Sequence, residues 1–226
     1  MSGDDAHAGG EAYDATPYVP RRGGLQAHRR AAASCKGCPL FENATRTVFG
    51  AGDPAARIVL VGEQPGDQED RQGEPFVGPA GRLLRDALKE AGLDQERVYV
   101  TNAVKHFRFT VAERGERRIH KAPSPKEMTG CKPWLDAELE LVDPDVVVAL
   151  GATAGKALLG RSFRVAKDRG ALIPLPLRER GDGHAEEAKG HVVATLHPSA
   201  VLRSDDHEAA YAGLVADLRV AADALH

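Results

Sequence analysis

The segment Arg57-Ile-Val-Leu-Val-Gly62 decides the fold class of this chain. It is a short apolar run that ends at a glycine and leads into a polar loop, which reads Glu63-Gln-Pro-Gly-Asp-Gln-Glu-Asp70. Such a run is typical of a strand that is buried on both faces, as the strands of a parallel sheet are. We therefore expect an α/β fold with this segment as a central strand.

Three more apolar runs of similar length follow along the chain, at residues 98–102, 146–150 and 191–195. Stretches with helical periodicity lie before, between and after these runs, at residues 25–33, 81–91, 124–141, 151–160 and 205–225. Strands that alternate with helices predict a three-layer α/β/α sandwich with a mostly parallel, four-stranded central sheet. Residues 172–184 fit either a hairpin or an irregular loop.

The length of 226 residues suits a single domain. Residues 1–24 are rich in Gly, Ala, Asp and Pro without an apolar period, which predicts a flexible N-terminal tail before a domain over residues 25–226. The sequence contains no apolar run near the roughly 18 residues of a membrane span, and no secretory signal. We therefore expect a cytoplasmic monomer that does not bind membranes.

The predicted strand ends locate a candidate site. Open α/β sheets bind their ligands beyond the carboxyl ends of the strands. Polar segments follow three of the four predicted strands, at residues 63–70, 102–120 and 197–199. We expect these segments to converge on one crevice.

The segment Gly151-Ala-Thr-Ala-Gly155-Lys156-Ala157 resembles a phosphate-binding loop only superficially. It is one residue short between the glycines, and Ala157 stands where a Ser or Thr would hold magnesium. We interpret the segment as a tight turn into a packed helix.

The chain has three cysteines, Cys35, Cys38 and Cys131, and an odd number does not indicate a disulfide framework. The spacing of Cys35 and Cys38 allows their thiolates to share a metal ion or a cluster. A redox pair is the alternative, but such pairs lie between a strand and a helix, whereas here a predicted helix comes before the pair.

Four segments carry a family resemblance when they are taken in order. They are Gly62 to Asp70 with Gly73-Glu-Pro-Phe76-Val-Gly-Pro-Ala-Gly81, then Thr101-Asn102-Ala-Val-Lys105, Leu150-Gly-Ala-Thr-Ala, and Leu196-His197-Pro198-Ser199. Together they resemble the motifs of the family 4 uracil-DNA glycosylases, which are iron–sulfur enzymes. The similarity spans about residues 25–225.

The resemblance implies that the protein recognises uracil in DNA, preferably single-stranded DNA, and cleaves its glycosidic bond. Phe76 would stack on the base, and Asn102 would read its polar edge, because an amide donates and accepts hydrogen bonds at once. His197 would stabilise the departing uracil anion, although it also fits a helix-cap or core role. The resemblance also implies pocket roles for Gly62, Gln64 and Asp67 and a DNA contact for Ser199.

Two features depart from the family 4 pattern. His106 stands in the place of a cysteine, and the loop Arg114-Gly-Glu-Arg117-Arg118-Ile119-His120 is inserted. With Gln64, these features resemble the UdgX branch, which excises uracil and then stays covalently joined to the DNA through the loop histidine. This resemblance implies that His120 attacks deoxyribose C1′ and that Glu63 orients its imidazole. A phosphate contact is the other role that His120 fits.

The position of His106 implies that it joins Cys35, Cys38 and Cys131 as the fourth ligand of a 4Fe–4S cluster, since imidazole can replace thiolate on a cluster iron. A structural zinc ion suits the same set of ligands. A solvent-facing position in the loop is the plain alternative for His106.

Residues 105–121 form a basic segment. They carry six Lys or Arg against Glu113 and Glu116, a local charge of 6 − 2 = +4 in a chain of net charge −3. This concentration predicts a DNA contact in which Arg117 and Arg118 bind phosphates. A turnover glycosylase that releases abasic DNA and a non-catalytic, zinc-stabilised DNA-binding module are the two alternatives to covalent capture.

Overall fold

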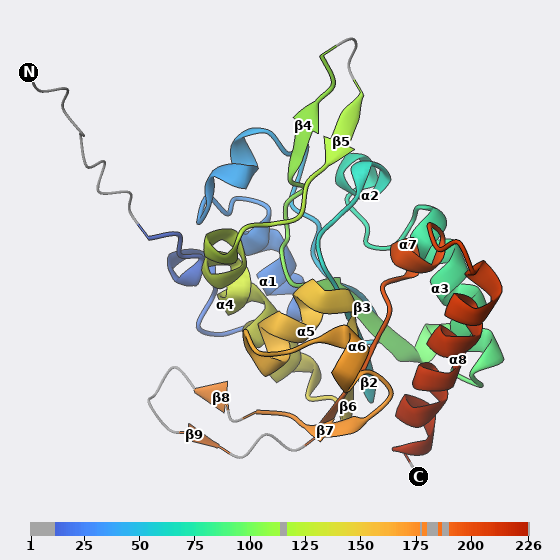
Figure 1. Ribbon diagram of the computed structural model, residues 1–226. Coiled ribbons are helices and arrows are strands. Elements are labelled where there is room, and N and C mark those ends of the chain that lie inside the picture. Colours follow the sequence, from blue (N-terminus) through green and yellow to red (C-terminus); the bar gives the residue numbers. More distant parts are fainter. Residues whose placement is uncertain (1–11, 114–116, 177, 180–184, 187–189, 226) are drawn as a thin grey trace, which may run out of the picture.

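A six-stranded sheet forms the centre of the computed structural model (Figure 1), with the strand order β1-β3-β2-β6-β10-β7. The structure describes residues 12–113, 117–176, 178–179, 185–186 and 190–225. The four inner strands run parallel and coincide with the four predicted strands: β3 (Val98–Asn102), β2 (Ile58–Gly62), β6 (Val146–Leu150) and β10 (His191–Thr195).

The sheet has two short edge strands that sequence analysis missed, so it contains six strands and not four. β1 (Ala51–Gly52) pairs antiparallel with β3, and β7 (Leu172–Pro174) pairs antiparallel with β10. Two or three residues are too few to produce a recognisable apolar period. Both strands form because a longer inner strand offers them free backbone groups.

The five long helices begin and end within two residues of the predicted ranges: α1 (Leu25–Ala32), α3 (Pro79–Glu90), α4 (Pro125–Val142), α5 (Gly151–Leu159) and α8 (His207–Asp223). The shorter helices are α2 (Asp67–Gln72), α6 (Val165–Asp168), α7 (Pro198–Val201), η1 (Thr16–Tyr18), η2 (Pro39–Glu42) and η3 (Gln95–Arg97). None of the helices in the described part of the chain is long and apolar enough to cross a membrane.

Alternate side chains of β2 pack against two different helical layers. Ile58 and Leu60 contact the cluster that contains the apolar faces of α3 and α8, whereas Val59 and Val61 contact the cluster that contains α4 and α5. Figure 1 shows the two pairs of helices on opposite sides of the sheet. The predicted three-layer α/β/α sandwich is therefore confirmed.

Two small hairpins lie outside the main sheet, one in the basic segment that we expected to be a loop and one that overlaps the segment for which a hairpin was one of two alternatives. β4 (Phe109–Val111) and β5 (Arg118–His120) pair antiparallel within the predicted basic loop, and Figure 1 shows this hairpin projecting from the body next to α2. β8 (Arg178–Glu179) pairs with β9 (Ala185–Glu186). Residues 172–184 thus contribute one edge strand and the first strand of a hairpin.

Part of the predicted tail packs on the domain. The backbone N–H of Asp14 donates to Gly37 O (2.9 Å), and that of Ala15 donates to Gly130 O (2.8 Å). Ala15 is buried beside the cysteines. Residues 1–11 lie outside the described part of the chain, so a tail there stays a prediction.

Gly81→Ala is expected to destabilise the protein, because a Cβ on residue 81 would overlap the backbone carbonyl of Phe76. Overpacking of this kind costs about 1–3 kcal/mol of the free energy of unfolding. Gly24→Ala is the matched control, since no atom lies within 4 Å of a Cβ at that position. Urea denaturation measures both variants, and equal unfolding midpoints would contradict this account.

Candidate active site

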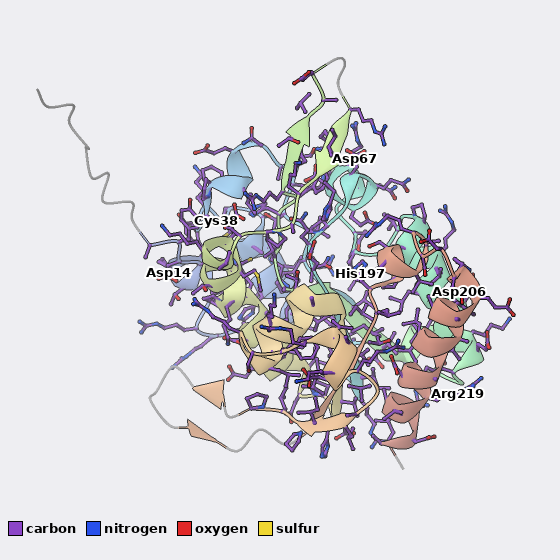
Figure 2. The ribbon with its side chains drawn as sticks, viewed as in Figure 1. Asp14, Cys38, Asp67, His197, Asp206 and Arg219 are labelled. Atoms are coloured by element: carbon purple, nitrogen blue, oxygen red, sulfur yellow. The ribbon has the colours of Figure 1, made fainter. Side chains whose placement is uncertain are left out.

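A cavity of about 470 Å³ opens at the carboxyl ends of the parallel strands, where the polar segments were expected to converge. In Figure 2, His197 lies at this edge of the sheet and Asp67 lies near the β4–β5 hairpin. The lining residues come from the ends of β3, β5 and β6 and from the segments that follow β2, β6 and β10: Glu63, Gln64, Gly66, Glu69, Phe76, Ala80, Asn102, His120, Leu150, Gly151, Ala152, Thr153, His197, Ser199, Ala200 and Arg203.

Gly62 lets two pocket side chains approach the end of β2. A Cβ on residue 62 would overlap Asn102 Oδ1 and would lie 2.7 Å from Phe76 Cζ. Asn102 is only 3% exposed, and none of the described residues forms a hydrogen bond with its side-chain amide. Its donor and its acceptor are therefore available to a molecule in the cavity.

Phe76 has a left-handed backbone conformation, with φ 55°. This conformation is uncommon for a bulky residue and persists only where the surroundings fix it. Gly81 packs against the Phe76 carbonyl, and Arg85 NH1 donates to the same oxygen at 3.1 Å. The Phe76 ring lies 6.2 Å from the His197 ring, with an angle of 29° between their planes.

His197 is the N-cap residue of α7. Its Nδ1 accepts a hydrogen bond from the backbone N–H of Ser199 (3.1 Å) and lies 2.8 Å from Ser199 Oγ. Burial, together with nearby Arg203 and His120, lowers the pKa of His197 to about 4. The imidazole is therefore neutral at pH 7, with its proton on Nε2 as a donor. The predicted cap role and a role in the cavity coexist in this residue.

His120 lies at the end of β5, lines the same cavity and is half-exposed. Its Nε2 lies 3.4 Å from Glu63 Oε1 and 2.9 Å from Gln64 Nε2. Burial lowers the pKa of His120, Arg203 lowers it as well, and Glu63 partly opposes them. A neutral imidazole with its lone pair on Nε2 accepts a hydrogen bond from the Gln64 amide.

Gln64 fixes both ends of the hairpin. Its Nε2 donates to Lys121 O (2.9 Å) and lies 3.2 Å from Arg108 O, and its Oε1 accepts from the Arg108 backbone N–H (3.0 Å). These three backbone contacts set the orientation of the amide, so that its nitrogen faces His120. Gln64 thus belongs to the site as predicted, and it also holds the hairpin in place.

Arg118, for which a DNA contact was predicted, pairs within the protein. Its side chain is only 10% exposed and forms ion pairs with Asp67 and with the buried Asp70. Its guanidinium also lies over the rings of Phe107 and Phe109, at 5.3 and 4.9 Å from their centres. These contacts stabilise the base of the hairpin, and the DNA contact stays a prediction.

Asp67 and Ser199 also differ from their predicted roles. Asp67 pairs with Arg71 and Arg118 and is not among the residues that line the cavity. Ser199 lines the cavity, but its hydroxyl and backbone both contact His197. Asp67 therefore stabilises the hairpin through Arg118, and Ser199 stabilises the start of α7 through His197.

The predicted basic patch is smaller than the local charge suggested. Lys105 is fully buried against Glu138, and Arg118 is neutralised by two carboxylates. Arg114 lies outside the described residues. Arg117 is exposed next to β5, and its phosphate contact stays a prediction.

Arg203 and Thr153 are site residues that sequence analysis missed. Arg203 lines the cavity beyond the end of α7 and influences both histidines. Thr153 donates to Glu63 Oε2 and so fixes this carboxylate beside His120. Thr153 lies in the glycine-containing segment 151–157, which forms a turn into α5. Its position soon after the end of β6 could have indicated that it belongs to the site.

The three cysteines are buried together in one cluster with Trp134 and Phe49. Trp134 Nε1 donates to Cys35 Sγ (3.2 Å), and the backbone N–H of Lys105 donates to Cys131 Sγ (3.3 Å). Burial raises the pKa of the Cys131 thiol to about 12. Such a thiol becomes a thiolate only when a metal binds it, and N–H donors to sulfur then stabilise the thiolate.

His106 follows Lys105 and is buried, so the solvent-facing alternative is wrong. Its Nε2 lies 2.8 Å from Thr47 Oγ1, and burial lowers its pKa to about 4, which keeps the imidazole neutral, as metal ligation requires. In the described part of the chain, no three His, Cys, Asp or Glu side chains lie close enough to share one metal ion.

Comparison with known proteins places the chain in a family. A model of the uracil DNA glycosylase superfamily matches residues 49–219. The chain is 39% identical to a type-4 uracil-DNA glycosylase of Thermotoga maritima, over 77% of this chain and 81% of the relative. A type-4 uracil-DNA glycosylase of Archaeoglobus fulgidus is 37% identical over 75% of this chain and 78% of its own. A type-5 enzyme of Thermus thermophilus is 38% identical over 58% of this chain and 64% of its own.

The chain therefore belongs to the uracil-DNA glycosylase superfamily. Within that superfamily it is type-4-like, since type-4 relatives match about three quarters of its length. The family resemblance of the four sequence segments is thereby confirmed, whereas membership of the UdgX branch stays a prediction.

Arg203→Gln is expected to raise the pKa of both His197 and His120, because the variant lacks the cation that disfavours protonation of each imidazole. Titration of the imidazole ring protons by NMR measures both pKa values. Arg161→Gln, beyond the end of α5, is the control and should leave them unchanged. Identical pKa values in the Arg203 variant and the wild type would refute this electrostatic coupling.

Proposed function

We propose that this protein excises uracil from DNA and that His120 then forms a covalent bond to deoxyribose C1′. The observation that carries the proposal is the position of His120: its Nε2 lies beside Glu63 and Gln64 in the cavity that Asn102 and His197 also line. Uracil excision is supported independently by relatives named as type-4 uracil-DNA glycosylases.

Three residues are suited to hold a flipped uracil. The Phe76 ring would stack on the base, and the unpaired amide of Asn102 would donate to one polar atom of the base and accept from another. The neutral His197 would donate its Nε2–H to the uracil carbonyl on which negative charge develops. A donor fixed before the reaction stabilises that charge without reorganisation.

The covalent step uses the lone pair of His120 Nε2. As the bond from C1′ to uracil breaks, its electron pair leaves with the base as the uracil anion, and C1′ becomes electron-poor. The Nε2 lone pair then forms the new bond to C1′. The resulting imidazolium loses its Nδ1 proton to solvent, the uracil anion gains one, and the products are free uracil and histidine-linked DNA.

Glu63 is suited to stabilise the cation that this step creates. Its Oε1 lies next to Nε2, the same nitrogen that would attack, and Thr153 holds its other oxygen. The carboxylate therefore lies where positive charge develops on both the imidazole and the sugar. This role differs from the predicted one, in which Glu63 would orient the imidazole.

Cys35, Cys38, Cys131 and His106 would hold a 4Fe–4S cluster. The buried thiols, the N–H donors to two sulfurs and the neutral imidazole suit these residues as ligands. A single zinc ion needs four ligand atoms within about 2.0–2.3 Å of one point, whereas a cluster of four irons accepts ligands that lie farther apart. The cluster would tie the segment before α2 to α4 and to the chain after β3.

The DNA would approach along the hairpin, where Arg117 is exposed for a phosphate contact. Single-stranded DNA is the substrate that we expect, because its bases need no unpairing before they enter the cavity. Action as a cytoplasmic monomer stays a prediction.

Incubation with a single-stranded oligonucleotide that contains one deoxyuridine tests the proposal. We expect release of free uracil and a DNA band that stays shifted in a denaturing gel. His120→Ser should abolish the shift and leave, at most, slow excision by water. His207→Ser is the matched control, because His207 is exposed on α8 away from the cavity, and it should behave as wild type.

The outcomes separate the two parts of the proposal. Uracil release with no shifted band would contradict capture and favour a turnover glycosylase. No uracil release from either single-stranded or duplex DNA would contradict excision itself and favour a non-catalytic DNA-binding module.

Iron and acid-labile sulfide analysis tests the cluster. Protein purified without oxygen should contain about four irons per chain and absorb at about 400 nm, as thiolate–iron clusters do. Cys131→Ser should lose this absorbance, whereas Met128→Leu in the same helix should retain it. Stoichiometric zinc in place of iron would overturn the cluster assignment.

A further inference from the structure

Lys105 places an ammonium group in the interior beneath the cavity. The side chains of Lys105 and Glu138 are 1% and 0% exposed, and they form an ion pair with each other. Burial of two charges costs several kcal/mol per ion before their attraction compensates, and an apolar pair of similar shape is often as stable. Stability alone therefore does not account for this pair.

All three N–H groups of the Lys105 ammonium donate hydrogen bonds, and one of them binds a residue that lines the cavity. Besides its pairing with Glu138, Nζ donates to Thr101 Oγ1 and to Asn102 O, each at 2.7 Å. Asn102 is the last residue of β3 and pairs with Gly62 at the end of the ladder. The ammonium thus fixes the backbone carbonyl of Asn102 at the point where the strand ends.

Glu138 anchors this arrangement to the rest of the fold. Its Oε1 accepts hydrogen bonds from Gly50 N (2.8 Å) and Tyr99 OH (2.9 Å), and its Oε2 accepts from Thr101 Oγ1 (2.9 Å). Burial and the adjacent Glu138 charge raise the pKa of Tyr99, which therefore stays a neutral donor. The carboxylate joins α4 to β3 and to the segment before β1.

The same lysine also contacts the cysteine cluster. Its backbone N–H donates to Cys131 Sγ at 3.3 Å, while its side chain donates to Asn102 O. A displacement at the cysteines therefore moves the residue that holds the end of β3. Asn102, which lines the cavity, is only three positions before Lys105, which contacts Cys131.

We propose that Lys105 and Glu138 are positioning residues that orient Asn102 toward the base and couple it to the cysteine cluster. The inference rests on the proposed function, since it assigns Asn102 to the base. No described residue forms a hydrogen bond with the Asn102 side-chain amide, so its direction is set by its backbone and by close packing on Gly62. The Lys105–Glu138 pair holds the backbone carbonyl of Asn102 and so contributes to the direction of its side chain.

A double variant tests this role apart from folding. Lys105→Met alone leaves a buried carboxylate without its cation, which is strongly destabilising and can prevent folding. Lys105→Met/Glu138→Leu removes both charges with side chains of similar shape and should keep a melting temperature close to that of the control. Tyr99→Phe is that control, because it removes one hydrogen bond from Glu138 and leaves the contact to Asn102 intact.

The readout is the single-turnover rate of uracil release from the deoxyuridine oligonucleotide, measured as a function of protein concentration. For the double variant we expect a maximal rate at least about ten-fold below wild type. The concentration for half-maximal rate and the absorbance near about 400 nm should be unchanged. Tyr99→Phe should retain the wild-type maximal rate.

A double variant with the wild-type rate would overturn the inference. So would a double variant that loses rate, melting temperature and absorbance together, since that pattern indicates a purely structural pair. Wild-type protein that releases no uracil would instead overturn the proposed function, and with it the role of Asn102.

Discussion

The parallel pairing of β2 with β3 on one side and β6 on the other is the constraint on which the site depends. It brings the ends of three strands to one edge, with Gly62 directly opposite Asn102. A slip of one residue would turn every side chain of a strand to the opposite layer. Asn102 would then face the helices rather than the cavity, and the missing Cβ of Gly62 would no longer be opposite it.

Burial gives the two histidines of the cavity complementary properties. Both have a lowered pKa, so both are neutral near pH 7, but their partners select opposite tautomers. His197 accepts a hydrogen bond on Nδ1 and presents an N–H, whereas His120 faces the Gln64 amide and presents a lone pair. In the proposed reaction this environment would supply a donor for the leaving base and a nucleophile for the sugar, and burial, helped by Arg203, lowers the pKa of both rings.

The sequence predicted the inner strands, the long helices and seven of the sixteen residues that line the cavity, because apolar runs and strand ends have strong local signals. It did not predict the roles of Arg118 and Lys105, both of which we counted as basic charges for DNA. Their partners Asp67, Asp70 and Glu138 are between 33 and 51 residues away in the chain, so only the tertiary fold reveals that these charges are neutralised. The short strands β1 and β7 were missed because their pairing depends on longer neighbours, and β4 and β5 were missed because each has only three residues.

The ion pairs of Arg118 bear on the choice between a turnover enzyme and a single-use trap. A nucleophile competes with water only if it is held near the reacting carbon before the base leaves, because an intramolecular group in position has a very high effective concentration. Arg118 fixes β5 to α2, and Gln64 fixes both hairpin ends, so His120 lies at the cavity before DNA arrives. Under the proposed function, this placement of the imidazole before DNA binds favours capture over hydrolysis.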